Sequence, residues 1–186
     1  LQDSGKDVFV ARAKRFIESA GDLDEDYGPS ARYAAGAPQS ILSGVPFAPC
    51  MVMLRSASFQ QVGGFRGGDV FWEDWDLWIR LAESGAGFEF DLGEPLADYR
   101  RSPESRSSDA LCCFRKSVAT LDLYWSSPLA SVWVKRRAKA RYLRWIGKAS
   151  QRIAERFFYF VRAILVAPWD FKNLACLAVI FSCTKK

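Results

Sequence analysis

The chain contains no histidine, and this absence excludes several kinds of chemistry at once. Serine or cysteine nucleophiles that rely on a histidine base are ruled out, and so are most transition-metal sites, because imidazole is their commonest ligand. The five cysteines are an odd number, and no two of them have the Cys-x-x-Cys spacing of zinc sites. We therefore expect free thiols in a reducing compartment and no disulfide framework.

Long apolar runs are also absent. None reaches the roughly 18 to 20 residues that a membrane-spanning helix requires. The first residue is Leu1 and not Met, and no signal peptide is recognisable, so we expect a fragment of a longer protein. The 186 residues are 49% apolar and 15% aromatic, which is typical of a globular protein with a substantial core.

Acidic side chains are scarce in the last part of the chain. Residues 131–186 carry 13 lysines and arginines against two acids, Glu155 and Asp170, whereas residues 1–130 carry 13 bases and 19 acids. The net charge of +5 therefore joins a mildly acidic body to a strongly basic tail. We expect two modules with different partners, divided after residue 130.

Within the acidic body, a glycine-rich turn leads into two adjacent carboxylates. Gly63-Gly64-Phe65 is followed eight residues later by Glu73-Asp74, which opens an amphipathic segment. Carboxylates in the first turn of a helix are favoured in their charged form and can serve as general bases. The alternative is that both residues only cap the helix, a position where acidic residues are common.

Hydrophobic periodicity predicts an α/β domain followed by helices. Three strands are expected, over Phe47–Leu54, Phe88–Leu92 and Leu96–Arg100. Helices are expected within Leu1–Ser19 and over Ser56–Gln61, Asp74–Ser84, Asp109–Trp125 and Val132–Val166, the last broken near Gly147. The polar segments Asp22–Ser43 and Ser102–Ser108 are predicted to be loops, and a further apolar run covers Leu174–Phe181.

Five sequence elements follow one another between Pro46 and Ser107. They are an apolar strand ending at Arg55, the turn Val62–Phe65, the helix start Glu73–Trp78, Arg80-Leu81-Ala82 before a glycine break, and the segment Pro95–Arg100. In this order they resemble the second half of the catalytic domain of family 2 glycosyltransferases, the inverting enzymes of the GT-A type. Each element alone is weak, and the order makes the resemblance specific.

The resemblance implies a partial GT-A domain, the fold of nucleotide-diphospho-sugar transferases, whose nucleotide-binding half would precede Leu1. The implied activity is sugar transfer from a nucleotide-diphospho-sugar to an acceptor hydroxyl of an envelope polysaccharide or a lipid-linked glycan. Asp74 would take the hydroxyl proton, and Glu73 would orient the acceptor. Gly63 and Gly64 would let the backbone approach the acceptor, and Trp72 would contact a sugar face.

Two positions depart from the pattern of the resembled family. The acidic metal motif of that family matches Asp3 here, but Gly5 and Lys6 follow it, so Asp3 is expected to hold Mg²⁺ or Mn²⁺ with Asp7 as a substitute second ligand. The alternative is an ordinary polar N-terminus. Ser102 stands where many relatives carry a histidine, which leaves Arg100 and Arg101 as candidate diphosphate contacts or as a solvated strand end.

The basic tail combines two stripes at helical spacing. The apolar stripe contains Ile146, Ala149, Ile153, Phe157, Phe160 and Ile164, and the basic stripe contains Arg137, Arg141, Arg144, Lys148, Arg152 and Arg156. We expect a helix that lies in the membrane interface, with its bases toward anionic lipid on the cytoplasmic face of the cell membrane. The alternative is a helix that covers the catalytic domain and exposes a solvated basic face.

Two further functions stay open. The charge of the tail would also suit a nucleic acid, although no recognition motif supports that reading. The chain is alternatively a non-catalytic remnant, because Gly5-Lys6 and the missing nucleotide-binding half argue against activity of this chain alone.

Overall fold

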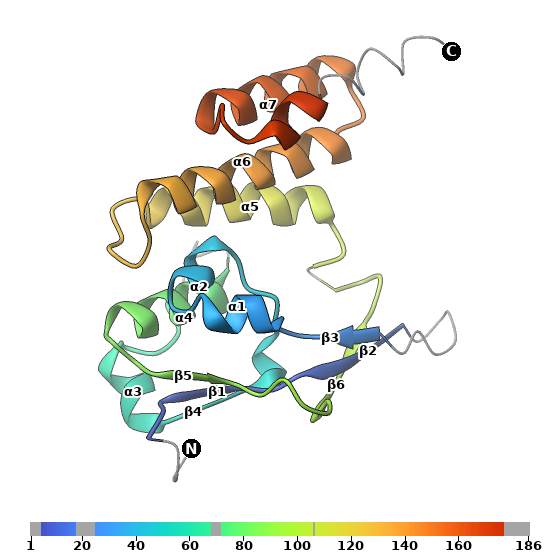
Figure 1. Ribbon diagram of the computed structural model, residues 1–186. Coiled ribbons are helices and arrows are strands. Elements are labelled where there is room, and N and C mark those ends of the chain that lie inside the picture. Colours follow the sequence, from blue (N-terminus) through green and yellow to red (C-terminus); the bar gives the residue numbers. More distant parts are fainter. Residues whose placement is uncertain (1–4, 18–24, 68–71, 106, 177–186) are drawn as a thin grey trace. The chain divides into compact units, whose positions relative to one another are not determined.

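The computed structural model describes residues 5–17, 25–67, 72–105 and 107–176, and it divides the chain into two compact units (Figure 1). Unit 1 comprises residues 1–108 with the short stretch Ser127–Leu129. Unit 2 comprises residues 109–126 and 130–186. The division expected after residue 130 therefore lies earlier, because the helix that follows Asp109 packs with the basic tail.

Unit 1 contains two small mixed sheets in the part of the chain that the structure describes. The first has the order β4-β1-β5 and the second the order β3-β2-β6. β1 is antiparallel to β4 and parallel to β5, and β2 is antiparallel to β3 and parallel to β6. The strands are β1 (Val8–Val10), β2 (Ala13–Ile17), β3 (Glu25–Tyr27), β4 (Val52–Leu54), β5 (Phe88–Phe90) and β6 (Ala97–Arg101).

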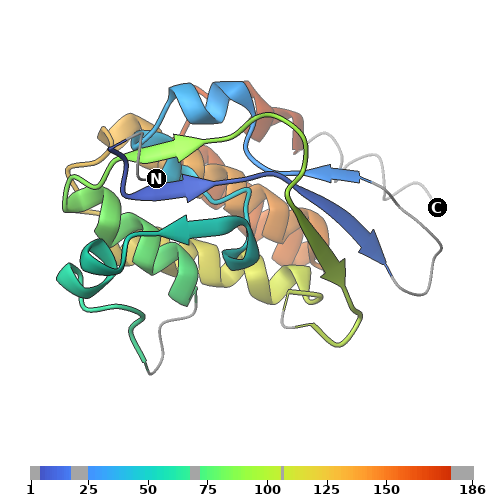
Figure 2. The ribbon, with the colours of Figure 1, turned by 90° about the horizontal axis from the view of Figure 1, so that it is seen from below.

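The two sheets share one continuous central chain path (Figure 2). Only Ala11 and Arg12 separate β1 from β2. The Asp91 N–H donates to the Val10 carbonyl at 2.9 Å, and the Leu96 N–H donates to the Arg12 carbonyl at 3.0 Å. Hydrogen bonding therefore continues from β1/β5 into β2/β6.

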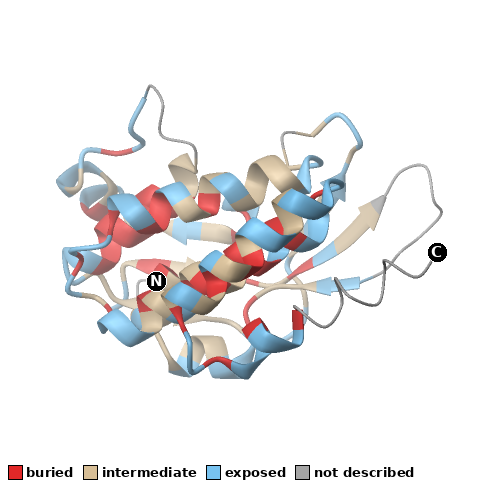
Figure 3. Ribbon diagram, turned by 90° about the horizontal axis from the view of Figure 1, so that it is seen from above, coloured by how far each residue is buried: buried red, intermediate tan, exposed pale blue. Residues whose placement is uncertain are grey.

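The helices of unit 1 surround an aromatic core. Phe47 lies 6.1 Å from the ring of Trp78 and 6.2 Å from that of Phe90, and all the residues from Trp75 to Ala82 are buried (Figure 3). The Trp75 indole N–H donates to the Ile41 carbonyl at 2.7 Å and joins α2 to α4. The helices are α1 (Ala31–Ala35), α2 (Gln39–Ser43), η1 (Pro49–Met51, a 3-10 turn), α3 (Ser56–Gln61) and α4 (Glu73–Glu83).

Several predicted elements are present with small changes of boundary. The predicted helix Ser56–Gln61 is α3, and the predicted helix Asp74–Ser84 is α4. The strands predicted at Phe88–Leu92 and Leu96–Arg100 are β5 and β6. The mixed α/β class of unit 1 is therefore confirmed.

Two predictions in the first third of the chain are wrong. The helix expected within Leu1–Ser19 is replaced in the described residues by β1 and β2, and Val8 and Val10 are buried on either side of the less buried Phe9, as in a strand. The loop expected over Asp22–Ser43 contains β3, α1 and α2, whose short lengths leave no clear periodicity. The strand predicted from Phe47 begins only at Val52, after η1.

Unit 2 consists of helices in the residues that the structure describes. They are α5 (Ala110–Leu123), α6 (Val132–Ala149) and α7 (Ile153–Val166), followed by helical residues 171–176. Ala140, Leu143, Ala163 and Ala167 form its buried core. The predicted helix Asp109–Trp125 is α5, and the apolar run Leu174–Phe181 lies partly outside the described residues.

The break expected near Gly147 lies slightly later, at Ser150. Gly147 is inside α6, where a Cβ atom would lie 2.5 Å from Cε1 of Phe160. The Ser150 hydroxyl donates to the Ile146 carbonyl at 2.8 Å, and Arg156 Nε donates to the Ser150 carbonyl at 2.6 Å. Gly147 thus provides space for a ring of α7, and the helix ends at the side-chain and main-chain bonds of Ser150.

Candidate functional site

The adjacent carboxylates lie in the first turn of α4, as predicted. Glu73 and Asp74 are both partly exposed, while Trp75 and the following residues are buried. Asp74 Oδ1 accepts a hydrogen bond of 2.8 Å from the Trp75 N–H. The helix N-terminus therefore stabilises the negative charge of a carboxylate that solvent and ligands can still reach.

A buried ion pair fixes α4 behind these carboxylates. Asp76 is 0% exposed and Arg80 is 7% exposed. Arg80 Nε donates to Asp76 Oδ2 at 2.8 Å, and its two terminal nitrogens donate to the carbonyls of Val62 and Gly64 at 2.6 and 2.7 Å. Arg80 thereby joins the glycine turn (Val62–Gly64) to the helix that begins at Glu73.

The glycines of this turn have a structural reason for being there. Gly63 and Gly64 have φ values of +76° and +64°, a backbone conformation that residues with a Cβ atom rarely adopt. A Cβ on Gly64 would also lie 2.9 Å from Cζ of Phe59. Chain reversal after α3 already requires these glycines, so the approach to an acceptor that the resemblance implies would be a role in addition to this one.

Two tyrosines that the sequence argument did not single out stack on each other in unit 1. Tyr27 on β3 and Tyr99 on β6, the tyrosine pair, stack with ring centroids 5.3 Å apart and an interplanar angle of 24°. Burial of the phenol, together with the interactions with Tyr99 and with the negative charge of Asp74, raises the pKa of Tyr27 to about 12. The positive charge of Arg15 acts in the opposite direction. The charge of Asp74 therefore acts on Tyr27.

Tyr99 lies on β6, which follows β5, and Tyr27 lies on β3, which pairs with β2, the strand that follows β1; the tyrosine pair therefore stands beyond the carboxyl ends of β1 and β5. Ligands of α/β proteins commonly bind at that edge of a sheet. Arg15 places its guanidinium carbon 5.7 Å from the Tyr27 ring centroid and pairs with Glu25. The tyrosine pair is therefore accompanied by a cation, and the charge of Asp74 acts on one of its phenols.

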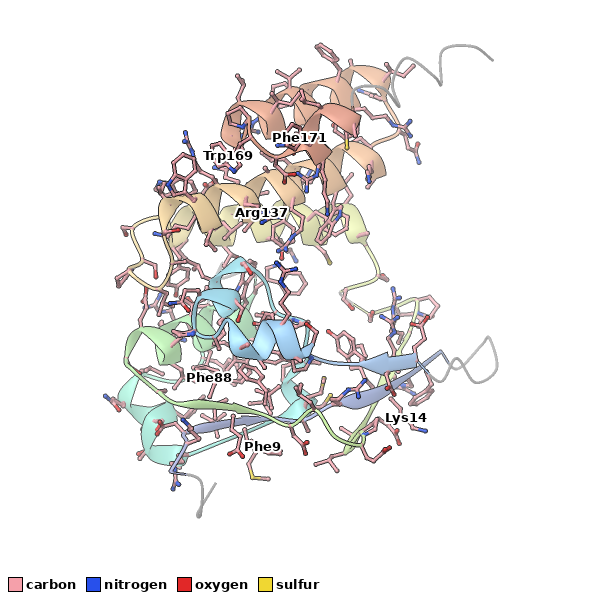
Figure 4. All side chains as sticks on the ribbon, viewed as in Figure 1. Phe9, Lys14, Phe88, Arg137, Trp169 and Phe171 are labelled. Carbon is pink, nitrogen blue, oxygen red and sulfur yellow. The ribbon has the colours of Figure 1, made fainter. Side chains whose placement is uncertain are left out.

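The two arginines predicted to bind a diphosphate point to opposite faces of the sheet. Arg100 pairs in register with Phe16, and Arg101 pairs with Ile17. Because side chains alternate along a strand, Arg101 shares the face of Tyr99, and Arg100 lies on the other face. Figure 4 illustrates the same alternation in the first sheet, where Phe9 and Phe88 occupy opposite faces. Because their side chains leave opposite faces of β6, the two arginines do not bind the same phosphate group in this arrangement.

Trp72 remains a candidate for ligand contact. It precedes α4, where its carbonyl accepts a hydrogen bond of 2.8 Å from the Asp76 N–H. Its indole nitrogen is buried and has no hydrogen-bond partner within the described residues. Trp78, by contrast, belongs to the core, as its helical position predicts.

Asp7 does not fit the role of metal ligand. Its Oδ1 accepts from the Ser58 hydroxyl at 2.7 Å, and its Oδ2 accepts from the Gly87 N–H at 2.8 Å. These bonds hold the pKa of Asp7 below its usual value and join β1 to α3 and β5. Asp3 lies outside the described residues, among which no group of three potential ligands is close enough to hold a metal ion.

The predicted basic stripe of unit 2 is only partly exposed. Arg137, Lys148 and Arg152 are exposed, while Arg141 and Arg156 are half-buried. Arg144 is buried, donates to Asp170 at 3.0 Å and also contacts the Asn173 side chain. The expected membrane role of Arg144 is therefore wrong, because Asp170 already neutralises its charge inside unit 2.

Comparison with known proteins adds no assignment: no protein-family model, curated protein or solved structure matches the chain. Within the described residues, no helix is both long and apolar enough to cross a bilayer.

The site residues that sequence reasoning missed are of two kinds. Asp76 and Arg80 carry a signal, their i,i+4 spacing on an otherwise apolar helix face. Tyr27 and Tyr99 carry none, because their contact depends on strand pairing.

Proposed function

We propose that unit 1 is the acceptor-side part of a GT-A glycosyltransferase domain and transfers a sugar from a nucleotide-diphospho-sugar to an acceptor hydroxyl. The observation that carries the proposal is the position of Asp74, partly exposed in the first turn of α4 and bonded to the Trp75 N–H. The resemblance between Pro46 and Ser107 supplies the reaction class. An envelope polysaccharide or a lipid-linked glycan is the proposed acceptor.

In this proposal, Asp74 accepts the proton of the attacking hydroxyl as the new glycosidic bond forms. Glu73 orients the acceptor, and the tyrosine pair provides a flat apolar surface with two hydroxyls for a sugar ring. Arg80 keeps the glycine turn fixed to α4, so the acceptor meets a preorganised wall. The donor and a divalent metal, Mg²⁺ or Mn²⁺, belong to the proposal, but no step is assigned to the metal because Asp7 does not suit it.

The test compares Asp74→Asn, Asp74→Glu and Glu73→Gln in protein that includes the donor-binding half. We expect Asp74→Asn to lower kcat by about 10²- to 10⁴-fold, because the amide keeps the shape but accepts no proton. Glu73→Gln should change mainly KM, and Asp74→Glu should retain part of the turnover. Release of nucleoside diphosphate is the readout, with circular dichroism as the folding control. Wild-type turnover in Asp74→Asn would remove Asp74 from this role.

A second function, association with the surface of an anionic membrane, is favoured by one face of α7. This face, which we call the apolar face of α7, consists of Ile153, Phe157, Phe158, Val161 and Leu165. Ile153 is 55%, Phe158 54% and Leu165 71% exposed. Arg152 and Arg162 flank it and are exposed, which favours anionic lipid over a neutral surface. A peripheral position on the cytoplasmic face of the cell membrane agrees with this arrangement.

Vesicle sedimentation tests this second function. Phe157→Ser combined with Leu165→Ser should abolish binding to phosphatidylglycerol vesicles, because both residues would insert into the interface. Leu123→Ser on α5 is the matched control, since Leu123 is 60% exposed but lies on another helix. Equal binding of both variants would contradict membrane association through α7.

A further inference from the structure

A cavity of about 350 Å³ lies within unit 2, between α6 and the segment that follows α7. It is lined by Arg137, Trp169, Asp170, Phe171 and Lys172, which we call the Trp169 pocket. Figure 4 labels Arg137 on α6 and the two aromatic residues of the following segment. Four of the five lining residues are consecutive, so a single segment builds one wall.

The Trp169 pocket presents a net positive charge to a ligand, because its one acidic residue is already paired. Asp170 is its acid, but Oδ2 of Asp170 accepts from Arg144 at 3.0 Å and Oδ1 accepts from the Lys172 N–H at 3.2 Å. Burial raises the pKa of Asp170, but these two bonds outweigh that effect and lower the pKa, helped by the charge of Arg137. Arg137 and Lys172 are exposed residues that line the same pocket, while the carboxylate of Asp170 is already paired with Arg144 inside unit 2.

The aromatic part of the pocket is held in place. The Trp169 ring lies 4.4 Å from the Trp133 ring at an interplanar angle of 70°, and the guanidinium carbon of Arg136 lies 5.7 Å from its centroid. Phe171 is 83% exposed and has no ring contact within the described residues. A fixed indole beside two cations, with a free aromatic ring at the rim, suits an anion that carries an apolar portion.

We propose that the Trp169 pocket binds a phosphate group, with Arg137 and Lys172 as its cationic contacts, and that the phosphate is the headgroup of an anionic lipid. The proposal rests on the membrane association argued above, and it goes further by naming a site and a ligand group. Exposed Trp133 and Phe171 on the same unit would enter the interface beside the bound headgroup. A soluble phosphate ester is the other source of the same chemistry.

The first experiment uses inorganic phosphate and the full chain without vesicles. Titration should change the tryptophan fluorescence at millimolar phosphate, and the change should disappear in Trp169→Phe. The double variant Arg137→Gln/Lys172→Gln should lose at least tenfold in phosphate affinity. The control Arg115→Gln/Lys148→Gln removes the same charge from exposed positions outside the pocket and outside α7, and it should leave phosphate affinity unchanged.

The second experiment compares both double variants on phosphatidylglycerol vesicles at low salt. Loss of two surface charges alone should weaken binding by about fivefold per charge in either variant. The proposal predicts a larger loss in the pocket variant than in the control, and competition by added phosphate only in the wild type and the control.

The outcomes separate the proposals. Equal vesicle binding by the two variants, with a phosphate response that depends on Trp169, assigns the pocket to soluble phosphate esters and overturns the lipid headgroup. Equal loss in both variants with no phosphate response overturns the site but leaves membrane association through α7 in place. Absence of vesicle binding by the wild type overturns membrane association, and the phosphate titration still decides the site.

Discussion

At the scale of single residues, Arg80 makes a set of contacts that no other cation in the described part of unit 1 makes. Its planar guanidinium reaches Asp76 and two turn carbonyls at once, whereas a lysine offers one point charge. We expect Arg80→Lys to lower the free energy of unfolding by about 2 to 4 kcal/mol, since buried acceptors lose their donors. Urea unfolding measures this loss.

Arg66→Lys is the matched control for that variant. Arg66 contacts the same carboxylate of Asp76 at 3.3 Å, but its side chain is 52% exposed. Exposed ion pairs contribute only about 0 to 1 kcal/mol, so the control should change stability little. Similar losses in both variants would contradict the role assigned to the Arg80 carbonyl contacts.

Because of Tyr27, we expect the free energy of unfolding of unit 1 to depend on pH in the alkaline range. Its pKa of about 12 in the folded chain exceeds its ordinary value of 10.0. The stabilisation of the neutral phenol is complete below pH 10 and is lost as the pH rises toward 12, because the unfolded chain releases the proton first. The loss amounts to about 2 to 3 kcal/mol.

Tyr27→Phe should remove this part of the alkaline loss. Ultraviolet titration of tyrosinate, run beside urea unfolding between pH 8 and pH 12, measures both effects. Burial also raises the pKa of Tyr142, so only the difference between wild type and variant identifies Tyr27. An unchanged slope of stability against pH in Tyr27→Phe would sink the assignment.

The sequence predicted where Glu73 and Asp74 lie better than it predicted the contacts that hold α4 in place. Glu73 and Asp74 follow from acidic residues at a helix start, a local pattern. The partners of Arg80 are main-chain carbonyls, which leave no trace in side-chain spacing. The Tyr27–Tyr99 contact joins strands 72 residues apart in the chain, and only the sheet register brings them together.

At the scale of elements, the contact between α6 and α7 depends on Gly147. A methyl group there would meet the ring of Phe160, which is 2% exposed and cannot swing away. Overpacking of this kind costs typically about 1 to 3 kcal/mol, so Gly147→Ala should lower the melting temperature although alanine favours helices.

A second substitution distinguishes overpacking from other effects. Phe160→Leu shortens the opposing side chain, so the double variant Gly147→Ala/Phe160→Leu should be more stable than the sum of the two single effects predicts. Lys148→Ala, at an exposed neighbouring position, controls for helix propensity. Additive losses in the thermal melts would count against direct contact.

Element prediction succeeded where length and periodicity agree, as in α4, α5 and α6. It failed at β1 and β2, because a strand of three residues followed by one of five is too short to show period two clearly. It also failed at α1 and α2, which have five residues each and depend on tertiary contacts such as the Trp75–Ile41 bond.

At the scale of the whole molecule, each unit has a core of its own. Asp170→Ala should therefore act on unit 2 alone. It leaves Arg144 buried without its carboxylate, which costs about 3 to 5 kcal/mol. Hydrogen exchange should show lost protection in α6 and α7 and unchanged protection in β1.

The control for this prediction is Arg137→Gln, which lies near Asp170 but is exposed and should change exchange in neither unit by much. Equal loss of protection in β1 and α6 upon Asp170→Ala would show that the units unfold as one. The independence expected from separate cores would then be wrong.

The junction between β5 and β6 has a consequence for how this molecule can vary. Leu92, Gly93, Glu94 and Pro95 leave the strand path between two hydrogen bonds, from Asp91 to Val10 and from Leu96 to Arg12. Strand pairing is present on both sides of this loop, and Leu92, Gly93 and Glu94 are exposed. Added residues would lengthen the loop at a small entropic cost and leave the register of Tyr99 untouched. Evolution or engineering could therefore change the length of this segment without disturbing the pairing of β6 with β2.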